Sequence, residues 1–230
     1  YGGGSDEKSP YGGQVTVPVL NRMDGLHPLV DRSVENVVQQ FLFNGLVAFN
    51  ESVEPTPDLA ESWMVSDDGL TWDFTVRRDV RFHDGELLTS EDVVFTLNEI
   101  LSNPLEYSMS PLFGNIASVT APDENTVRII LRQPYAPLLH LLTVDILPSH
   151  LLTGELEIER FRKNPIGTGA FEFSSWEGDV ITLHANEGYF KGRPYLDSLV
   201  IKYLHDKTQA WSELMQGKVS IVTDLDPEDY

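Results

Sequence analysis

Six histidines and 36 acidic residues are the side chains of this chain that could bind a metal ion or move a proton. His83 precedes Asp84-Gly85, a dipeptide that is typical of a turn, and no second histidine follows at the four-residue spacing of a zinc-binding helix. His205 precedes Asp206, which is well placed to cap a helix. The other histidines form no metal-ligand pattern. They are His27, His140, His150 and His184.

Two further motifs suggest ligand chemistry but are incomplete. Gly167-Thr168-Gly169 lacks the remaining glycine and the lysine of a phosphate-binding loop. Asp224-x-Asp226-x-Glu228 has the spacing of a calcium loop, but Asp229 stands where that loop needs glycine. The chain has no cysteine, no Gly-x-Ser-x-Gly elbow and no carboxylate pair set apart as in glycosidases. These patterns predict no enzyme, no metal and no other cofactor.

The overall charge of the chain argues against some classes of binding partner. A formal net charge of −20, from 36 acidic and 16 basic residues, argues against nucleic acid and against docking on anionic lipid. An acidic surface could attract cationic ligands, but solubility is the preferred explanation of the charge. No run of 18 apolar residues is present, so the sequence predicts no membrane span.

The stretch 57–101 predicts the elements that would position any functional side chain. Asp67-Asp68-Gly69 is a turn between two apolar runs. Trp72, Phe74 and Val76 alternate with polar residues, which is the period of a half-buried strand. Thr89 is a good N-cap for a helix, whose first turn is acidic and whose apolar residues recur at helical spacing. This stretch therefore predicts a β-hairpin followed by a capped helix.

The remaining segments predict a mixture of helices and strands. We expect strands at 14–20 and 199–204, hairpins over 116–131 and 171–183, and a last strand at 219–222. Helices are expected from residue 34, at 136–142, at 155–163 and after Asp206, the last with Ala210, Leu214 and Met215 on its packed face and Gly217 ending it. We expect an extended connection at 54–57 and a long surface loop at 102–115.

Two long strings in this order resemble a known family. LAESW…SDDGLTWDFTVRRDVRFHDGELLTSEDVVFTL resembles the central signature of the extracytoplasmic solute-binding proteins of ABC importers, and it is most similar to their dipeptide, oligopeptide and nickel branch. NPIGTGAFEFSSWEGDVITLHANEGYFKGRPYLDSLVIKYL is a second match. The resemblance covers most of 14–230. One departure is Leu26-His27-Pro28, where the family commonly has Leu-Asp-Pro.

The resemblance implies a mixed α/β fold, the two-lobed clamp of type II periplasmic binding proteins. Residues 1–13 would form a flexible tether, 14–46 and 167–230 an incomplete first lobe, and 47–166 an inserted subdomain. The second lobe would follow Tyr230. Without it, open sheet edges are expected to favour self-association.

The resemblance also implies a function. The protein would capture di- or oligopeptides outside the cytoplasmic membrane and deliver them to an ABC permease, without making or breaking bonds. It would be periplasmic or a cell-surface lipoprotein, with a signal peptide and a lipidated cysteine before Tyr1. The alternatives are a nickel-chelate, haem or oligosaccharide binder on the same fold, or a signalling or chaperone-like relative without transport.

Family members hold an extended peptide largely through main-chain hydrogen bonds, as in strand addition. The resemblance places such contacts just after the Leu-Asp-Pro position and after the last predicted strand. We add two residues that could lie near a cleft, one at the departure from the motif and one in the expected loop. The candidate ligand-binding residues are Asp31, Arg32, Ser33, Val34, Thr223, Asp224, His27 and Tyr107.

Overall fold

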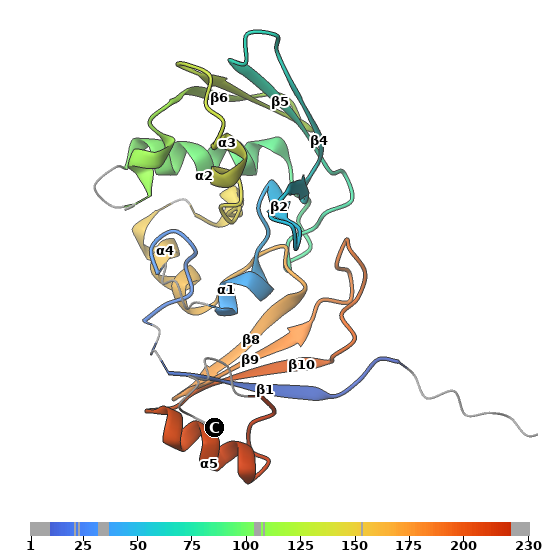
Figure 1. Cartoon of the computed structure of the whole chain (residues 1–230), viewed down its shortest axis with the longest axis vertical. Helices are drawn as coiled ribbons and strands as arrows, with labels where there is room; N and C mark the ends of the chain where they lie inside the picture. The colour runs from blue at the N-terminus through green and yellow to red at the C-terminus, as the bar shows by residue number, and fades with distance from the viewer. Residues whose placement is uncertain are drawn as a thin grey trace, which may run out of the picture. The chain divides into compact units, whose positions relative to one another are not determined.

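The chain divides into two compact units, which are described separately (Figure 1). One unit combines residues 1–22 with 170–230, and the other is the continuous stretch 23–169. The computed structural model describes residues 10–20, 22, 24–31, 37–103, 107, 109–152 and 154–221.

This division differs from the lobes that we expect from the sequence. Residues 23–46, expected in the first lobe, belong to the continuous unit. The backbone N–H of Leu26 donates to the carbonyl oxygen of Arg162 at 2.9 Å, and that of Val47 donates to Leu142 at 3.2 Å. These long-range hydrogen bonds have no local sequence signal. The lobe boundaries at 46 and 167 stay a prediction for the longer protein.

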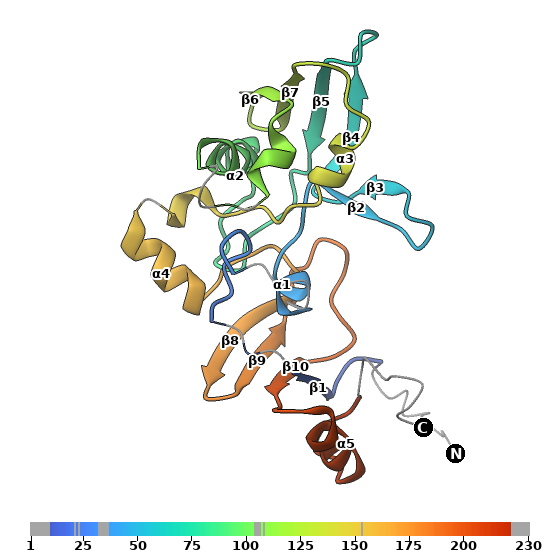
Figure 2. The ribbon, with the colours of Figure 1, turned by 60° about the vertical axis from the view of Figure 1, so that its left-hand side comes forward.

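The unit that combines the two ends of the chain contains a four-stranded sheet in the order β1-β10-β9-β8. Strand β1 pairs in parallel with β10, and the other neighbours are antiparallel. Helix α5 lies beside β10 and β1 (Figure 2), where Ala210 packs with Leu204 and Val219 in a small core. The bounds are β1 Gln14–Val19, β8 Phe171–Glu177, β9 Val180–Ala185, β10 Ser198–Tyr203 and α5 Lys207–Met215.

The ends of α5 are largely as predicted. The Asp206 carboxylate accepts the backbone N–H of Gln209 at 2.7 Å, which confirms the N-cap, and Gly217 has the left-handed φ of 69° that favours glycine. Met215 is 81% exposed, so its assignment to the packed face is wrong. The strand predicted at 219–222 is absent from residues 219–221, because a single residue pairs with β1 there: the Ser220 N–H donates to the oxygen of Thr16, whereas the Val219 N–H donates to Glu213.

The continuous unit is built on an antiparallel sheet in the order β4-β5-β7-β6, with α2 packed against it (Figure 1). Phe74 and Val76 of β5 and Val127 and Ile129 of β7 are buried, as the period-two pattern predicts. The hairpins and the helix are confirmed. The bounds are β4 Ala60–Val65, β5 Thr71–Val76, α2 Ser90–Ser102, β6 Ile116–Asp123 and β7 Thr126–Leu131.

Helix α2 begins with a capping box. The Asp92 carboxylate accepts the backbone N–H of Thr89 at 2.9 Å, and a hydrogen bond from the N3 backbone to the Thr89 side chain completes the motif. The other oxygen of Asp92 accepts the N–H and the hydroxyl of Ser149, at 3.0 and 2.8 Å. Asp92 therefore joins the start of the helix to a segment far along the chain.

Short elements complete this unit. Residues 102–115, expected as a surface loop, contain a 3₁₀ helix, and the side chains of Tyr107 and Phe113 are buried. No helix of the described residues is long and apolar enough to span a membrane. The remaining bounds are α1 Val37–Leu42, β2 Val47–Phe49, β3 Pro55–Pro57, η1 Ser110–Phe113, α3 Leu138–Leu141, η2 Ser149–Leu151 and α4 Glu155–Lys163.

Candidate functional site

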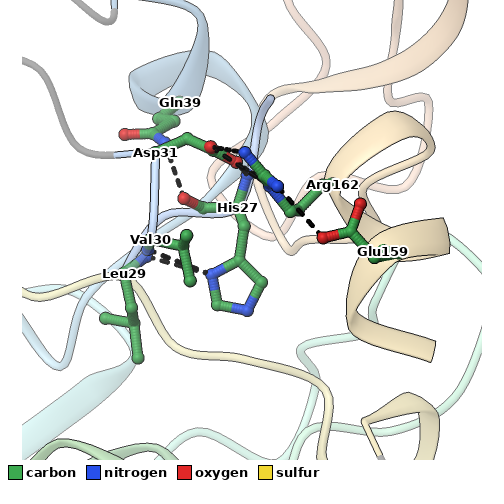
Figure 3. Close-up of polar contacts among 7 residues, drawn as sticks. All are labelled: His27, Leu29, Val30, Asp31, Gln39, Glu159 and Arg162. Atoms are coloured by element: carbon green, nitrogen blue, oxygen red, sulfur yellow. Dashed lines mark hydrogen bonds and ion pairs between the residues drawn. The ribbon is translucent and has the colours of Figure 1, made fainter. Parts of the chain in front are cut away.

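The loop that contains Leu26-His27-Pro28 is organised around the imidazole of His27, whose side chain is 1% exposed. Its Nδ1 accepts the backbone N–H groups of Leu29 at 3.2 Å and Val30 at 3.4 Å (Figure 3). The edge of the ring packs on Phe161, with 5.4 Å between the ring centroids. Because Nδ1 is an acceptor, the neutral ring carries its proton on Nε2.

Burial keeps this ring neutral. The pKa of His27 is lowered from 6.5 to about 4, mainly by desolvation; the charge of Asp31 opposes this effect and the charge of Arg162 adds to it. The hydrogen bonds from Leu29 and Val30 require the same neutral form. His27 therefore acts as a hydrogen-bond acceptor for the loop at neutral pH.

The carboxylate of Asp31 closes the loop. It accepts the backbone N–H of His27 at 2.9 Å and the Nε–H of Arg162 at 3.0 Å, with a further short hydrogen bond from Arg162 Nη2 (Figure 3). Glu159 also accepts from Arg162, at 3.0 Å, and the hydrogen bonds that Arg162 donates to the two carboxylates raise its pKa. A Cβ at Gly25 would lie 2.1 Å from the Asp31 carboxylate, so this close approach requires glycine.

A second cluster joins two of the sequence motifs. The His83 N–H donates to the oxygen of Gly167 at 2.9 Å, and the Gly167 N–H donates to His83 Nδ1 at 3.2 Å. His83 Nε2 lies 3.1 Å from the carbonyl oxygen of Gly169, to which it donates. Burial lowers the pKa of His83 to about 4, against the opposing effects of the Gly169 carbonyl and Asp84. The turn at 83–85 thereby holds the segment 167–169.

Neighbouring residues hold that segment from its other side. The Thr168 hydroxyl donates to Asn44 Oδ1 at 3.2 Å, and Asn44 Nδ2 donates to the buried carboxylate of Asp58 at 3.2 Å. The Gly169 N–H donates to the oxygen of Leu42 at 2.9 Å. This polar network ties residues 167–169 to the neighbouring segments of the same unit.

Neither cluster has the composition of a catalytic or metal centre. Among the described residues, no group of three or more histidine, cysteine, aspartate or glutamate side chains could hold a metal ion. His27 and His83 accept or donate fixed backbone hydrogen bonds, and Asp31 is paired with Arg162. Both clusters hold loops in place.

The comparison with protein families identifies the class. The model of the bacterial extracellular solute-binding proteins, family 5, matches residues 54–230 through its middle region. The chain belongs to this family.

Curated proteins whose names give different ligands are similar to this chain. It is 33% identical over 216 residues to the oligopeptide-binding protein AppA of Bacillus subtilis, covering 90% of this chain and 39% of AppA. It is also 33% identical over 221 residues to heme-binding protein A of Haemophilus influenzae, covering 84% of this chain and 40% of that protein. The chain thus spans about two-fifths of the length of these curated relatives.

Solved structures of similar proteins share the fold. The complex of AppA with a nonapeptide matches with a TM-score of 0.88 and 31% identity, over 94% of this chain and 44% of AppA. NikZ from Campylobacter jejuni in complex with Ni(L-His) matches with a TM-score of 0.85 and 34% identity, over 93% and 43%. The expected mixed α/β, type II periplasmic-binding-protein fold is confirmed for this part of the protein.

The structure brings together only part of the candidate ligand set. His27 and Asp31 lie in one buried cluster, joined by Arg162 and Gln39, which sequence reasoning did not select. Tyr107, expected to face a cleft from a loose loop, has a side chain only 3% exposed, so the expected exposure is not found. The other candidates lie outside the described residues. They are Arg32, Ser33, Val34, Thr223 and Asp224.

Arg162 carries no sequence signal for its role. It is separated from Asp31 by 131 residues, and its helix is polar enough to be assigned to the surface. The one sequence feature that involves Arg162 is the basic last turn of α4, and the favourable interaction of basic residues with the helix dipole explains this feature equally well.

Proposed function

We propose that this chain forms part of the solute-binding component of an ABC importer that captures di- or oligopeptides outside the cytoplasmic membrane and passes them to the permease. The observation that carries the proposal is the similarity, in sequence and in fold, to AppA, whose structure holds a nonapeptide. On this proposal the protein is periplasmic or attached to the cell surface, and it releases its ligand chemically unchanged.

The peptide would be held mainly by main-chain hydrogen bonds. We assign the first contact to 31–34 and the second to Thr223 and Asp224. We propose that His27 and Asp31 support the first contact segment and do not bind the peptide with their side chains, since both side chains form hydrogen bonds with the backbone of the loop itself. Arg32 is then the residue of this loop that we expect to pair with a ligand carboxylate.

A second candidate ligand is a metal chelate or haem. It is supported by the similarity to NikZ, solved with Ni(L-His), and to heme-binding protein A. Because the family hosts several ligand classes, fold alone does not choose between them.

Native mass spectrometry of the natural protein that contains this chain, purified gently from its host, tests the proposal. We expect an added mass in the range of a peptide, which dissociates when the protein is partly unfolded. An added mass that matches a nickel chelate or haem would show that the ligand is not a peptide. Ligand-free protein whose thermal midpoint does not shift with any peptide of a library would contradict the transport proposal.

A pair of arginine variants of the natural protein tests the site. Arg32→Ala is expected to weaken peptide binding about tenfold by removing one charge-assisted pair. Arg22→Ala is the matched control, because its side chain is 66% exposed and lies 3.8 Å from Asp179, an exposed pair of little energetic value. Equal affinities for the two variants would remove Arg32 from the site.

A further inference from the structure

The tip of the hairpin between β2 and β3 contains a strained residue. Val53 has a φ of 60°, and it is the only non-glycine residue with positive φ among those that the structure describes. A β-branched side chain strongly disfavours this conformation. The Val53 side chain is also 68% exposed, on a loop that extends away from the rest of its unit (Figure 2). Burial of apolar surface therefore does not offset the strain.

The rest of the tip makes the turn without help from the valine side chain. Asn50 Oδ1 accepts the N–H groups of Ser52 at 3.0 Å and Glu54 at 2.9 Å. The Val53 N–H donates to the oxygen of Asn50 at 2.9 Å, and Asn50 Nδ2 donates to the Glu54 carboxylate at 3.1 Å. Glycine or asparagine at position 53 would form the same hydrogen bonds with less strain.

The tip thus holds an isopropyl group rigidly in water at a cost to stability. Strain of this kind persists where the exposed group has a use, and a fixed apolar group loses little conformational entropy on binding. The charges beside it are acidic, because Glu51 and Glu54 are exposed and 50–54 contains no basic residue. The net charge of −20 disfavours both a second copy of the chain and an anionic membrane as the partner.

We propose that Val53 is the anchor of a docking surface for another protein, which presents an apolar recess with a basic rim. The side chain of Val53 fills the recess, and Glu51 and Glu54 face the rim. This surface is distinct from the candidate ligand-binding residues, and the proposal holds whatever solute the protein carries.

Stability measurements test the strain. In the whole chain, Val53→Asn and Val53→Gly are expected to raise the thermal midpoint by about 2–4 °C, although both remove apolar atoms. Val53→Thr keeps the β-branch and is expected to leave the midpoint within about 1 °C. A lower midpoint for Val53→Asn would show that the conformation is unstrained and would overturn the proposal.

Site-specific crosslinking tests the partner. In host cells, the natural protein would carry photoreactive benzoylphenylalanine in place of Val53 or, as the control, in place of Met64, which is 72% exposed. We expect one discrete protein adduct from position 53 and none of the same mass from position 64. Adducts with lipid alone, with a second copy of the chain, or equally from both positions would contradict the proposal.

The protein identified by mass spectrometry would then be purified and its affinity measured. Val53→Asn is expected to weaken binding about tenfold, as loss of an interface anchor does, while Val53→Ile retains it. Glu51→Gln with Glu54→Gln is expected to slow association and to reduce its salt dependence. An affinity unchanged in Val53→Asn would mean that the crosslinked protein is a chance neighbour.

Discussion

At the scale of single residues, His27 shows how an imidazole can replace a carboxylate. An aspartate at this position, as in the Leu-Asp-Pro pattern, would accept N–H groups two and three residues ahead. His27 Nδ1 accepts those same groups from Leu29 and Val30. The imidazole preserves the turn, but protonation of Nδ1 removes its acceptor, whereas a protonated carboxyl group keeps an oxygen that can accept.

This difference predicts a pH dependence of stability. The pKa of His27 is lowered from 6.5 to about 4 in the folded protein, so between these values the unfolded chain binds the proton more tightly. The contribution of neutral His27 to the free energy of unfolding is complete above about pH 6.5. As the pH falls towards 4, this free energy decreases by on the order of 2 kcal/mol. In His27→Asn the amide oxygen accepts the same N–H groups without titrating.

Urea unfolding between pH 4.5 and 7.5 measures the effect. The free energy of unfolding of His27→Asn is expected to fall less steeply with acidification than that of the parent protein. Some pH dependence of the same sign remains in His27→Asn, because burial lowers the pKa of His83 too. His184→Asn, at an exposed histidine, is the control. Identical slopes for His27→Asn and the parent would refute the assignment.

The Asp31–Arg162 pair predicts a large loss from one substitution. Arg162→Met leaves the carboxylate of Asp31, 7% exposed, without its cationic partner, and we expect a loss of about 3 kcal/mol in the free energy of unfolding. Glu159→Gln is the control, because Glu159 is 62% exposed and its pair should be worth about 0.5 kcal/mol or less. Equal losses in urea unfolding would contradict this.

At the scale of elements, the carboxylate of Asp92 both caps the start of α2 and accepts hydrogen bonds from Ser149. Thr89→Ala removes only part of the capping box and is expected to cost about 1 kcal/mol. Asp92→Ala also leaves the N–H and hydroxyl of Ser149 without their acceptor, so we expect about 2–4 kcal/mol. Glu91→Ala, an exposed change in the same helical turn, is the control. Thermal or urea unfolding ranks the three variants by stability. A smaller loss of stability for Asp92→Ala than for Thr89→Ala would contradict the stabilising role of the Ser149 hydrogen bonds.

The segment 167–169 makes a steric prediction. A Cβ at Gly169 would lie 2.3 Å from the carbonyl oxygen of Phe41, whereas one at Gly188 would meet nothing closer than 3.6 Å. Gly169→Ala is therefore expected to destabilise the protein by more than about 2 kcal/mol, and Gly188→Ala by less than about 0.5 kcal/mol. Chemical unfolding compares them, and a neutral Gly169→Ala would mean that α1 moves aside.

These examples show which features the sequence can predict. The hairpin around Asp67-Asp68-Gly69 and the N-cap at Asp206 depend on neighbouring residues, so the local pattern contains the information. The burial of Tyr107 and the role of Arg162 depend on contacts between distant segments, for which one sequence provides no signal. Residues 219–221 are apolar enough for a strand, but strand pairing needs a neighbour, and here only Ser220 makes a backbone hydrogen bond to β1.

At the scale of the whole molecule, the charge of −20 that these 230 residues carry predicts, on the proposed peptide-binding function, a preference in the rate of peptide capture. For the natural protein, peptides rich in lysine should associate about tenfold faster than acidic peptides of equal length at low salt. This ratio should shrink towards one at about 0.5 M salt, where the Debye length is only a few ångströms. Stopped-flow fluorescence measures both rates. A ratio that does not change with salt would mean that the acidic surface lies far from the entry path.

The parallel pairing of β1 with β10 also joins two strands that are made at different times. Gln14 lies opposite Ser198, so β1 is synthesised well before its partner strand. At about 5–20 residues per second, that delay is roughly 10–40 s, during which the whole of 23–169 has already been synthesised. During that delay β1 lacks its parallel neighbour, and its open edge needs protection from wrong strand partners.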